Sequence, residues 1–185
     1  SSTLEQYSSF GVALDIGVMY VYKEWDLNIS GVARNIGTQI TTYDEIYEPI
    51  PFELIFGISQ TLENIPIRWH LTFENMQIWN VAFENPNREE IDLEGNVKEE
   101  NINFIDNVFR HTIVGIELFP DKGFNIRLGY NFRRGEELRI VEKRAFAGIS
   151  AGFSIKLNKL RLSYTYSKFS VAAATSYFGL NLDLQ

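Results

Sequence analysis

The chain contains two histidines, His70 and His111, and no cysteine. Neither histidine has a second histidine or a cysteine at the spacing of a zinc site, so a metal ion would need carboxylates gathered from elsewhere in the chain. The sequence also lacks the Gly-x-Ser-x-Gly elbow, the phosphate-binding loop and the dinucleotide-binding glycine motif. We therefore predict a protein that is not an enzyme and that uses no metal and no cofactor.

A group of charged side chains is the strongest remaining candidate for chemistry. Alternation within residues 64–76 places Arg68, His70 and Glu74 on one side of a strand. Arg127 occupies the corresponding side of a later strand. Such a group could exchange protons, but charges of both signs that point into a narrow barrel pair with one another in the same way. We interpret these four residues as a lumen cluster.

The same two-residue alternation recurs along the chain, whereas the 3.6-residue period of helices is almost absent. It predicts an all-β protein with nine strands, each with a mostly apolar side and a second side of small or polar residues. The predicted strands are 10–22, 25–33, 52–58, 65–73, 112–118, 124–132, 147–157, 160–166 and 178–184. In the fourth strand, Trp69 and Phe73 lie on the apolar side.

The predicted connections alternate between short and long. Two-residue turns at 23–24, 63–64 and 158–159 would place Tyr22 opposite Trp25, Leu62 opposite Ile65, and Leu157 opposite Leu160. A five-residue loop at 119–123 would bring Leu118 to Phe124. The remaining connections are the long loops 37–51, 80–110, 134–144 and 168–176.

This alternation favours an antiparallel up-and-down barrel with its short turns at one end and its long loops at the other. Strand length, an apolar side and aromatic residues near strand ends are typical of transmembrane barrels in the bacterial outer membrane. A soluble sandwich or a lipocalin-like barrel, with the apolar side inward, is the alternative. Nine strands is an odd number, whereas bacterial single-chain barrels have an even one, so we expect an N-terminal part of the barrel to be missing.

Composition excludes several classes of protein. With 45% hydrophobic and 22% charged residues the chain must fold, and it has no run of eighteen apolar residues for a transmembrane helix. A net charge of −7 argues against nucleic acid as a partner.

The two most charged segments lie in predicted loops. Residues 81–109 carry eight acidic and two basic side chains. Within this segment, Ile102, Ile105, Val108 and Phe109 recur at near-helical spacing and predict a short amphipathic helix over the barrel mouth. Residues 130–139 mix three arginines with two glutamates. They would either form a docking site for lipopolysaccharide phosphates or a partner, or neutralise each other in pairs; we favour the second.

Several ordered blocks resemble the PorQ family, outer-membrane proteins of the type IX secretion system of Bacteroidetes related to PorV and to FadL-like barrels. The blocks are "PIPFELIFGISQTLENIPIRWHLTFENMQIWNV" (49–81), "NFIDNVFRHTIVGIELFPDKGFNIRLGYNFRRGEELRI" (103–140), "LRLSYTYSKFSVAAATSYFGLNLDL" (160–184) and "GVARNIG" (31–37). The end "ATSYFGL" departs from the histidine- or asparagine-rich end that we expect of the family.

The resemblance implies an integral outer-membrane barrel of about fourteen strands, of which residues 1–185 would hold the C-terminal nine as part of one domain. The long loops would be extracellular and the C-terminus periplasmic. It further implies a non-catalytic role: anchoring a PorZ-like surface protein in the attachment complex, with PorU and PorV as indirect partners and lipopolysaccharide as the acceptor of cargo. A FadL-like transporter of hydrophobic molecules and a PorV-like cargo shuttle remain the alternatives.

Loop length and position suggest which residues would face such a partner. The candidates are Tyr43, Tyr47, Trp79, Phe83, Glu89, Glu90, Asp92, Phe104, Arg134 and Glu136. An anchor predicts a lumen filled with polar groups, whereas a transporter predicts a continuous apolar passage.

Overall fold

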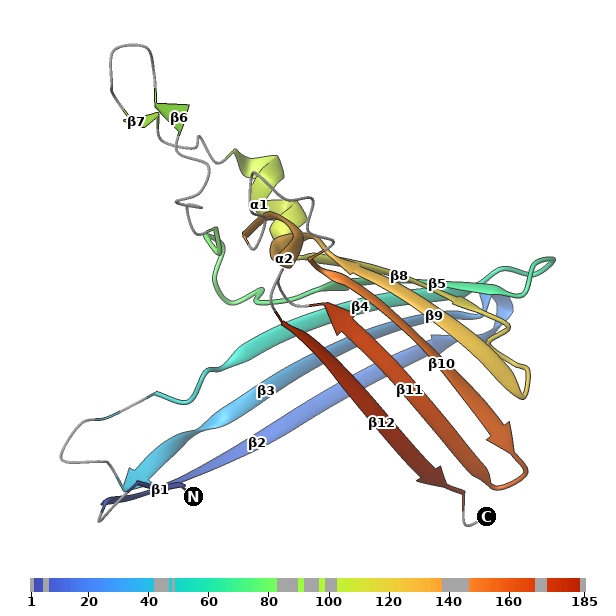
Figure 1. Ribbon diagram of the computed structural model, residues 1–185, viewed down its shortest axis with the longest axis horizontal. Helices are drawn as coiled ribbons and strands as arrows, with labels where there is room; N and C mark the ends of the chain where they lie inside the picture. The colour runs from blue at the N-terminus through green and yellow to red at the C-terminus, as the bar shows by residue number, and fades with distance from the viewer. Residues whose placement is uncertain are drawn as a thin grey trace.

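The protein is an all-β chain built on one antiparallel sheet (Figure 1). The computed structural model describes residues 2–4, 7–41, 47, 49–82, 90–91, 97–98, 103–137, 147–168 and 173–183. The sheet contains β1 (Ser2–Leu4), β2 (Tyr7–Tyr22), β3 (Leu27–Thr41), β4 (Glu53–Thr61), β5 (Ile67–Phe73), β8 (Thr112–Leu118), β9 (Phe124–Asn131), β10 (Ile149–Leu157), β11 (Leu160–Lys168) and β12 (Ala174–Leu182). Its order follows the chain, so each strand from β2 to β11 is hydrogen-bonded to the strands before and after it in this sheet.

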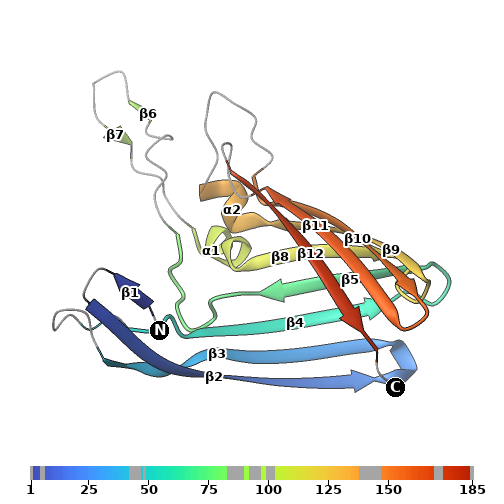
Figure 2. The same ribbon diagram turned by 60° about the horizontal axis from the view of Figure 1, so that its bottom comes forward.

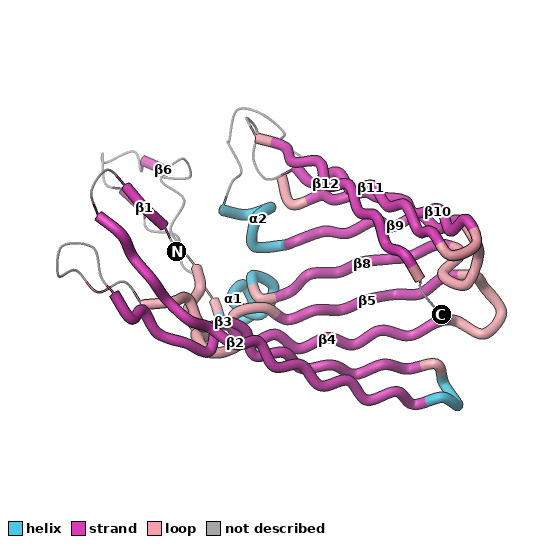
Figure 3. Tube along the Cα trace, turned by 90° about the horizontal axis from the view of Figure 1, so that it is seen from below, coloured by secondary structure: helices cyan, strands magenta, loops and turns pink. Residues whose placement is uncertain are grey.

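The sheet curls strongly but does not close. β1 and β12 stand at the two ends of the strand order, and the described residues form no pairing between these ends (Figure 3). The twist of successive strands leaves β2 and β12 running at a steep angle to each other (Figures 1 and 2). The prediction of an antiparallel up-and-down sheet is confirmed; a closed barrel is not formed by the described part of the chain.

From β2 to β12, short and long connections lie at opposite ends of the sheet, as the sequence predicts. The short-turn end carries the connections 23–26, 62–66, 119–123 and 158–159, and the described chain finishes there at residue 183 (Figure 1). The long connections lie at the opposite end, which we call the helical end because the two helices described below lie there. Strands extend further toward this end than predicted: β3 continues through the first residues of segment 37–51, and β11 and β12 enter segment 168–176 from either side.

Turn register differs from the prediction by two residues at three of the four short connections. Only the turn 158–159 pairs its flanking residues as expected, Leu157 with Leu160. In the other hairpins Tyr22 lies opposite Leu27, Leu118 lies opposite Ile126, and the amide of Leu62 donates to the carbonyl of Ile67 at 2.9 Å. Because side chains alternate with a period of two, a shift of two residues leaves each on its predicted face.

Two short helices sit at the helical end, beside β8 and β9 (Figures 1 and 2). The first, α1 (Phe104–Arg110), is the predicted amphipathic helix, and a capping box between Asn103 and Asp106 begins it. The second, α2 (Phe132–Glu137), replaces the strand end and loop expected there. Asn131 accepts a hydrogen bond from the amide of Arg134 at 3.0 Å, which turns the chain from β9 into the helix. The small strands β6 (Glu90–Ile91) and β7 (Val97–Lys98) pair with each other.

On β8, β9 and β10 the two faces of the sheet are covered to different degrees, and the more covered face is the polar one. On β8, Glu117 is 6% exposed whereas its neighbour Ile116 is 41% exposed. Among the described residues the buried hydrophobic side chains are Val81 and Ala147 alone. The buried polar side chains are Asn107, Arg110, His111, Thr112, Glu117, Asn125, Asn131 and Ser154. This distribution is the reverse of a water-soluble sheet packed on an apolar core.

Candidate functional site

The exposed face of the sheet forms a continuous apolar surface, which we call the apolar belt. Strand pairing aligns its side chains in rows that cross the sheet. One row contains Trp69, Ile116, Leu128, Ala151 and Tyr166, and the next contains Leu118, Ile126, Phe153, Tyr164 and Phe178. In the second row the ring centroid of Tyr164 lies 5.7 Å from that of Phe153 and 4.9 Å from that of Phe178. Aromatic packing therefore joins β10, β11 and β12 across the belt.

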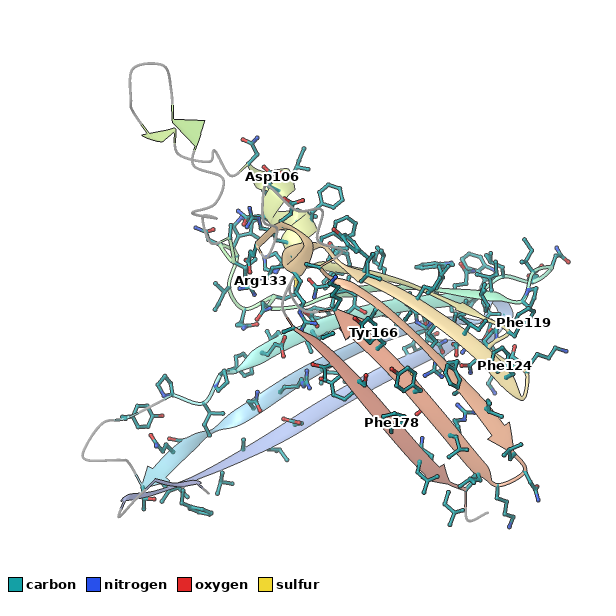
Figure 4. All side chains as sticks on the ribbon, in the orientation of Figure 1. Asp106, Phe119, Phe124, Arg133, Tyr166 and Phe178 are labelled. Carbon is teal, nitrogen blue, oxygen red and sulfur yellow. The ribbon has the colours of Figure 1, made fainter. Side chains whose placement is uncertain are left out.

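Aromatic side chains also mark the edges of the apolar belt. Phe119 and Phe124 stand at the short-turn end (Figure 4). At the same end Trp25 meets Tyr22 edge to face, with ring centroids 5.5 Å apart. Tyr164 and Phe178, by contrast, pair in the middle of their strands rather than near strand ends, because β11 and β12 extend beyond the predicted bounds.

The covered face carries a charged network centred on Glu117. One carboxylate oxygen of Glu117 accepts from Nε of Arg127 at 3.0 Å. The other oxygen lies 3.5 Å from Nη1 of Arg68 and 3.8 Å from Nε2 of His70. A buried carboxylate is tolerated only when opposite charges and hydrogen bonds replace its water, and here two arginines from neighbouring strands do so.

Arg68 extends this network to the short-turn end. Its Nη2 lies 3.9 Å from Oδ2 of Asp26 and 3.6 Å from Oδ1 of Asp121. Its Nε donates to the hydroxyl of Thr61 at 2.9 Å. One guanidinium group thus contacts the turn that precedes β3, the end of β4 and the turn between β8 and β9. The network ties together the turns at this end of the covered face.

The structure brings Arg68, His70 and Arg127 of the predicted cluster together but leaves Glu74 apart. Glu74 lies one residue beyond β5, toward the helical end. Burial raises the pKa of the Glu74 carboxyl, and the negative charge of Glu53 acts in the same direction. The acid that completes the cluster is Glu117, which the sequence reasoning did not single out. Alternation in 112–118 puts Glu117 in phase with Gly115 on the polar side, and that was the signal available.

Polar contacts continue along the covered face beyond the charged network. The hydroxyl of Ser154 donates to Oδ1 of Asn125 at 2.9 Å, and both side chains are buried. Glycines occupy further positions of this face, and an added Cβ at Gly152 would lie 2.7 Å from the carbonyl oxygen of Tyr164. Small and hydrogen-bonded residues therefore occupy this face where β9, β10 and β11 meet.

His111 performs a structural task at the helical end. Its ring is buried, with Nδ1 2.6 Å from the carbonyl oxygen of Glu74 and Nε2 3.0 Å from that of Trp79. Each ring nitrogen faces a backbone carbonyl oxygen of the segment that follows β5, so the imidazole lies between that segment and the end of α1. Within the described residues no three potential ligands gather as a metal site requires.

The candidate partner-facing residues are distributed as follows. Trp79 and Phe104 stack with ring centroids 4.9 Å apart at the helical end. Arg134 and Glu136 lie in α2, and Glu90 lies in β6. The hydroxyl of Tyr47, an exposed residue, is 3.1 Å from Oγ1 of Thr38. Tyr43, Phe83, Glu89 and Asp92 fall outside the described residues.

This arrangement combines an exposed apolar surface with a charged, hydrogen-bonded face behind it. None of the described helices is long and apolar enough to cross a membrane. A scan against protein-family models, a search of curated proteins and a search of solved structures each returned no match to this chain.

Proposed function

We propose that this chain forms part of the wall of a bacterial outer-membrane β-barrel, with the apolar belt toward lipid and the charged face toward the lumen. The observation that carries the proposal is the reversed burial: Glu117, Asn125 and Ser154 are covered, whereas the side chains of the apolar belt are not. Transmembrane barrels have this distribution, because lipid meets the outer side of each strand and the inner side is polar.

Energetics supports lipid as the medium around the belt. Fully burying one large apolar side chain is worth roughly 1.5–3 kcal/mol relative to leaving it in water. Ile116, Leu128 and Phe153 are each more than a third exposed, and rows of apolar residues run from β5 to β11 and from β8 to β12. A contiguous apolar surface of this extent is rare on a soluble monomer. The acyl chains of a bilayer would cover these side chains. They would remove the cost of exposing apolar surface to water without a second layer of protein.

The resemblance to the PorQ family supplies the proposed biological role. The protein is a non-catalytic component of the type IX secretion system that holds a PorZ-like surface protein at the outer membrane, with PorU and PorV as indirect partners. The complete barrel has about fourteen strands, and the further strands would close it between the β1–β2 edge and the β12 edge of the sheet. The helical end faces the cell exterior, the short turns face the periplasm, and the partner binds the acidic loop within 81–109.

Transport of a hydrophobic molecule is the competing function. A FadL-like passage requires apolar surface along the lumen, whereas the face proposed to line it carries Glu117 bonded to Arg127 and close to Arg68. Moving an apolar ligand past these ion pairs would strip them of their remaining water or break them. The charged network therefore favours the anchor over the transporter.

The anchoring role is tested by co-purification from detergent-solubilised outer membrane, followed by mass spectrometry. Full-length protein is compared with a variant that lacks residues 84–100 and with a control, Lys159→Glu, that changes charge in a short turn. We expect a PorZ-like protein to co-purify with the parent and the control and to be lost with the deletion. Absence of any such partner from a correctly inserted parent would refute the anchor. Recovery of many secreted proteins instead would favour the cargo shuttle.

A further inference from the structure

The short helix α1 exposes its apolar side and buries its polar side. Phe104 is 68% exposed, Ile105 is 64% exposed and Phe109 is 49% exposed. Asn107 and Arg110, on the other side of the helix, are buried. A helix that covers the mouth of a barrel in water would present these two sides the other way round.

The exposed side of α1 is continuous with the apolar belt. Ring centroids of Phe109 and Phe132 are 5.2 Å apart, and those of Phe132 and Tyr130 are 5.0 Å apart. Tyr130 belongs to the belt, because strand pairing places it opposite Val114 on β8 and Ile149 on β10. A chain of stacked aromatic rings thus leads from the belt directly to the helix.

Three charged side chains in the described part of α1 and α2 pair with one another on the buried side of α1. Nη1 of Arg110 lies 3.9 Å from Oε1 of Glu137, and Nε of Arg133 donates to the same oxygen at 2.9 Å. These groups join the buried side of α1 to α2. Asp106 is the exception, since it is exposed and hydrogen-bonded to the amide of Asn103 at 3.1 Å (Figure 4). Because the Asp106 carboxylate lies in the first turn, we expect α1 to lie at a depth in the membrane where water still reaches this carboxylate.

We propose that α1 lies in the interface of the outer leaflet, with Phe104, Ile105 and Phe109 at the boundary between headgroups and acyl chains. Amphipathic helices bind membranes in this way, with the apolar side a few ångströms below the headgroups. The inference rests on the proposed membrane-embedded barrel. It adds the level along the barrel at which the extracellular surface of the membrane lies. It assigns Phe104 to lipid rather than to a protein partner, because its exposed side continues the lipid-facing surface.

The absence of cysteine from the sequence allows a direct test. Ile105→Cys, Leu128→Cys and Asn158→Cys are each labelled with an environment-sensitive fluorophore in the full chain. The labelled proteins are reconstituted in phosphatidylethanolamine–phosphatidylglycerol vesicles that carry a nitroxide at either headgroup or mid-chain depth. We expect headgroup nitroxide to quench the label at 105 at least about twofold more than mid-chain nitroxide does, and the reverse order at 128. Aqueous iodide should reach the label at 158 and leave the label at 105 largely unquenched.

The outcomes separate this inference from the function on which it rests. If iodide quenches position 105 and nitroxide lipids do not, while position 128 is quenched by mid-chain nitroxide, α1 is not in the interface and the barrel proposal stands. If position 128 also escapes lipid quenching, both proposals fail. Phe104→Cys is a second reporter on the same side of α1, and only variants that match the parent in circular dichroism and in migration without boiling are scored.

Discussion

The two faces of β8 differ as much as any two regions of the molecule, although their residues alternate along a single strand. Ile116 points to the exposed belt, and its surroundings are apolar side chains of β5 and β9. Glu117, the next residue, points to the covered face and meets Arg68 and Arg127 from the same two strands. One strand therefore has two faces with different surroundings, and we expect each face to be sensitive to a different kind of substitution.

Placing a charge on the apolar belt tests this comparison with the largest expected effect. Leu128→Arg should destabilise the inserted protein by about 2–4 kcal/mol, the cost of arginine on the lipid face near the bilayer midplane. The matched control is Asn181→Arg, on an exposed position of the polar face, which should change stability much less. Denaturant unfolding of both variants in lipid vesicles measures the difference. Equal effects at the two positions would mean that the belt does not face lipid.

Removing the carboxylate of Glu117 tests the polar face of the sheet. Glu117→Gln should lower the free energy of unfolding by about 2 kcal/mol, because Arg68 and Arg127 lose the carboxylate that neutralises them while keeping part of their hydration. Ile116→Leu, at the neighbouring belt position, should be nearly neutral because it conserves volume and polarity. The same unfolding assay applies. A neutral Glu117→Gln would show that water already solvates both arginines.

At the helical end the prediction concerns hydrogen bonds instead of charge. His111→Phe keeps an aromatic ring beside Trp79 but leaves the carbonyl oxygens of Glu74 and Trp79 without this partner. We expect a loss of about 1–3 kcal/mol, the usual cost of leaving a buried polar group unsatisfied. Protease digestion of the intact protein should cut the segment after β5 earlier in the variant than in the parent. Unchanged digestion would argue that water replaces the imidazole.

The smallest effect is expected at the rim of the charged network. Asp26→Asn removes one of three acids near Arg68, but Asp26 is largely exposed and 3.9 Å away. An exposed pair of this kind is worth about 0–1 kcal/mol, so unfolding should be almost unchanged. A loss as large as that of Glu117→Gln would mean that the short-turn end is much less hydrated than its exposure indicates.

Within the strands, alternation predicted the face of the side chains beside the short turns correctly even where it did not predict their neighbours. Leu118 was expected beside Phe124 and lies opposite Ile126, yet all three belong to the apolar belt. Turn geometry sets the pairing, and a two-residue sequence pattern does not contain it. The spacing of apolar residues predicts α1. It does not predict α2, because residues 132–137 directly follow an alternating strand and are mostly charged, with no apolar residues at helical spacing.

Sequence alternation has the same limit for the charged network, because it does not predict which side chains are in contact. Arg68, His70 and Arg127 were grouped because they share the polar side of their strands, and Glu74 was included for the same reason. Sharing a side does not imply contact, since β5 carries Glu74 toward the helical end while Arg68 lies near the short turns. The pairing of Arg68 with Glu117, and of Glu117 with Arg127, comes from the register of three strands.

By itself the sequence determined an antiparallel sheet with one apolar and one polar face, because side-chain direction along a strand depends only on a period of two. It also determined which connections are short. Tertiary structure alone decided that the polar face is the covered one, that Glu117 stands between two arginines, and that the apolar side of α1 joins the belt. These features depend on curvature, register and helix packing, which arise from contacts between segments far apart in the chain.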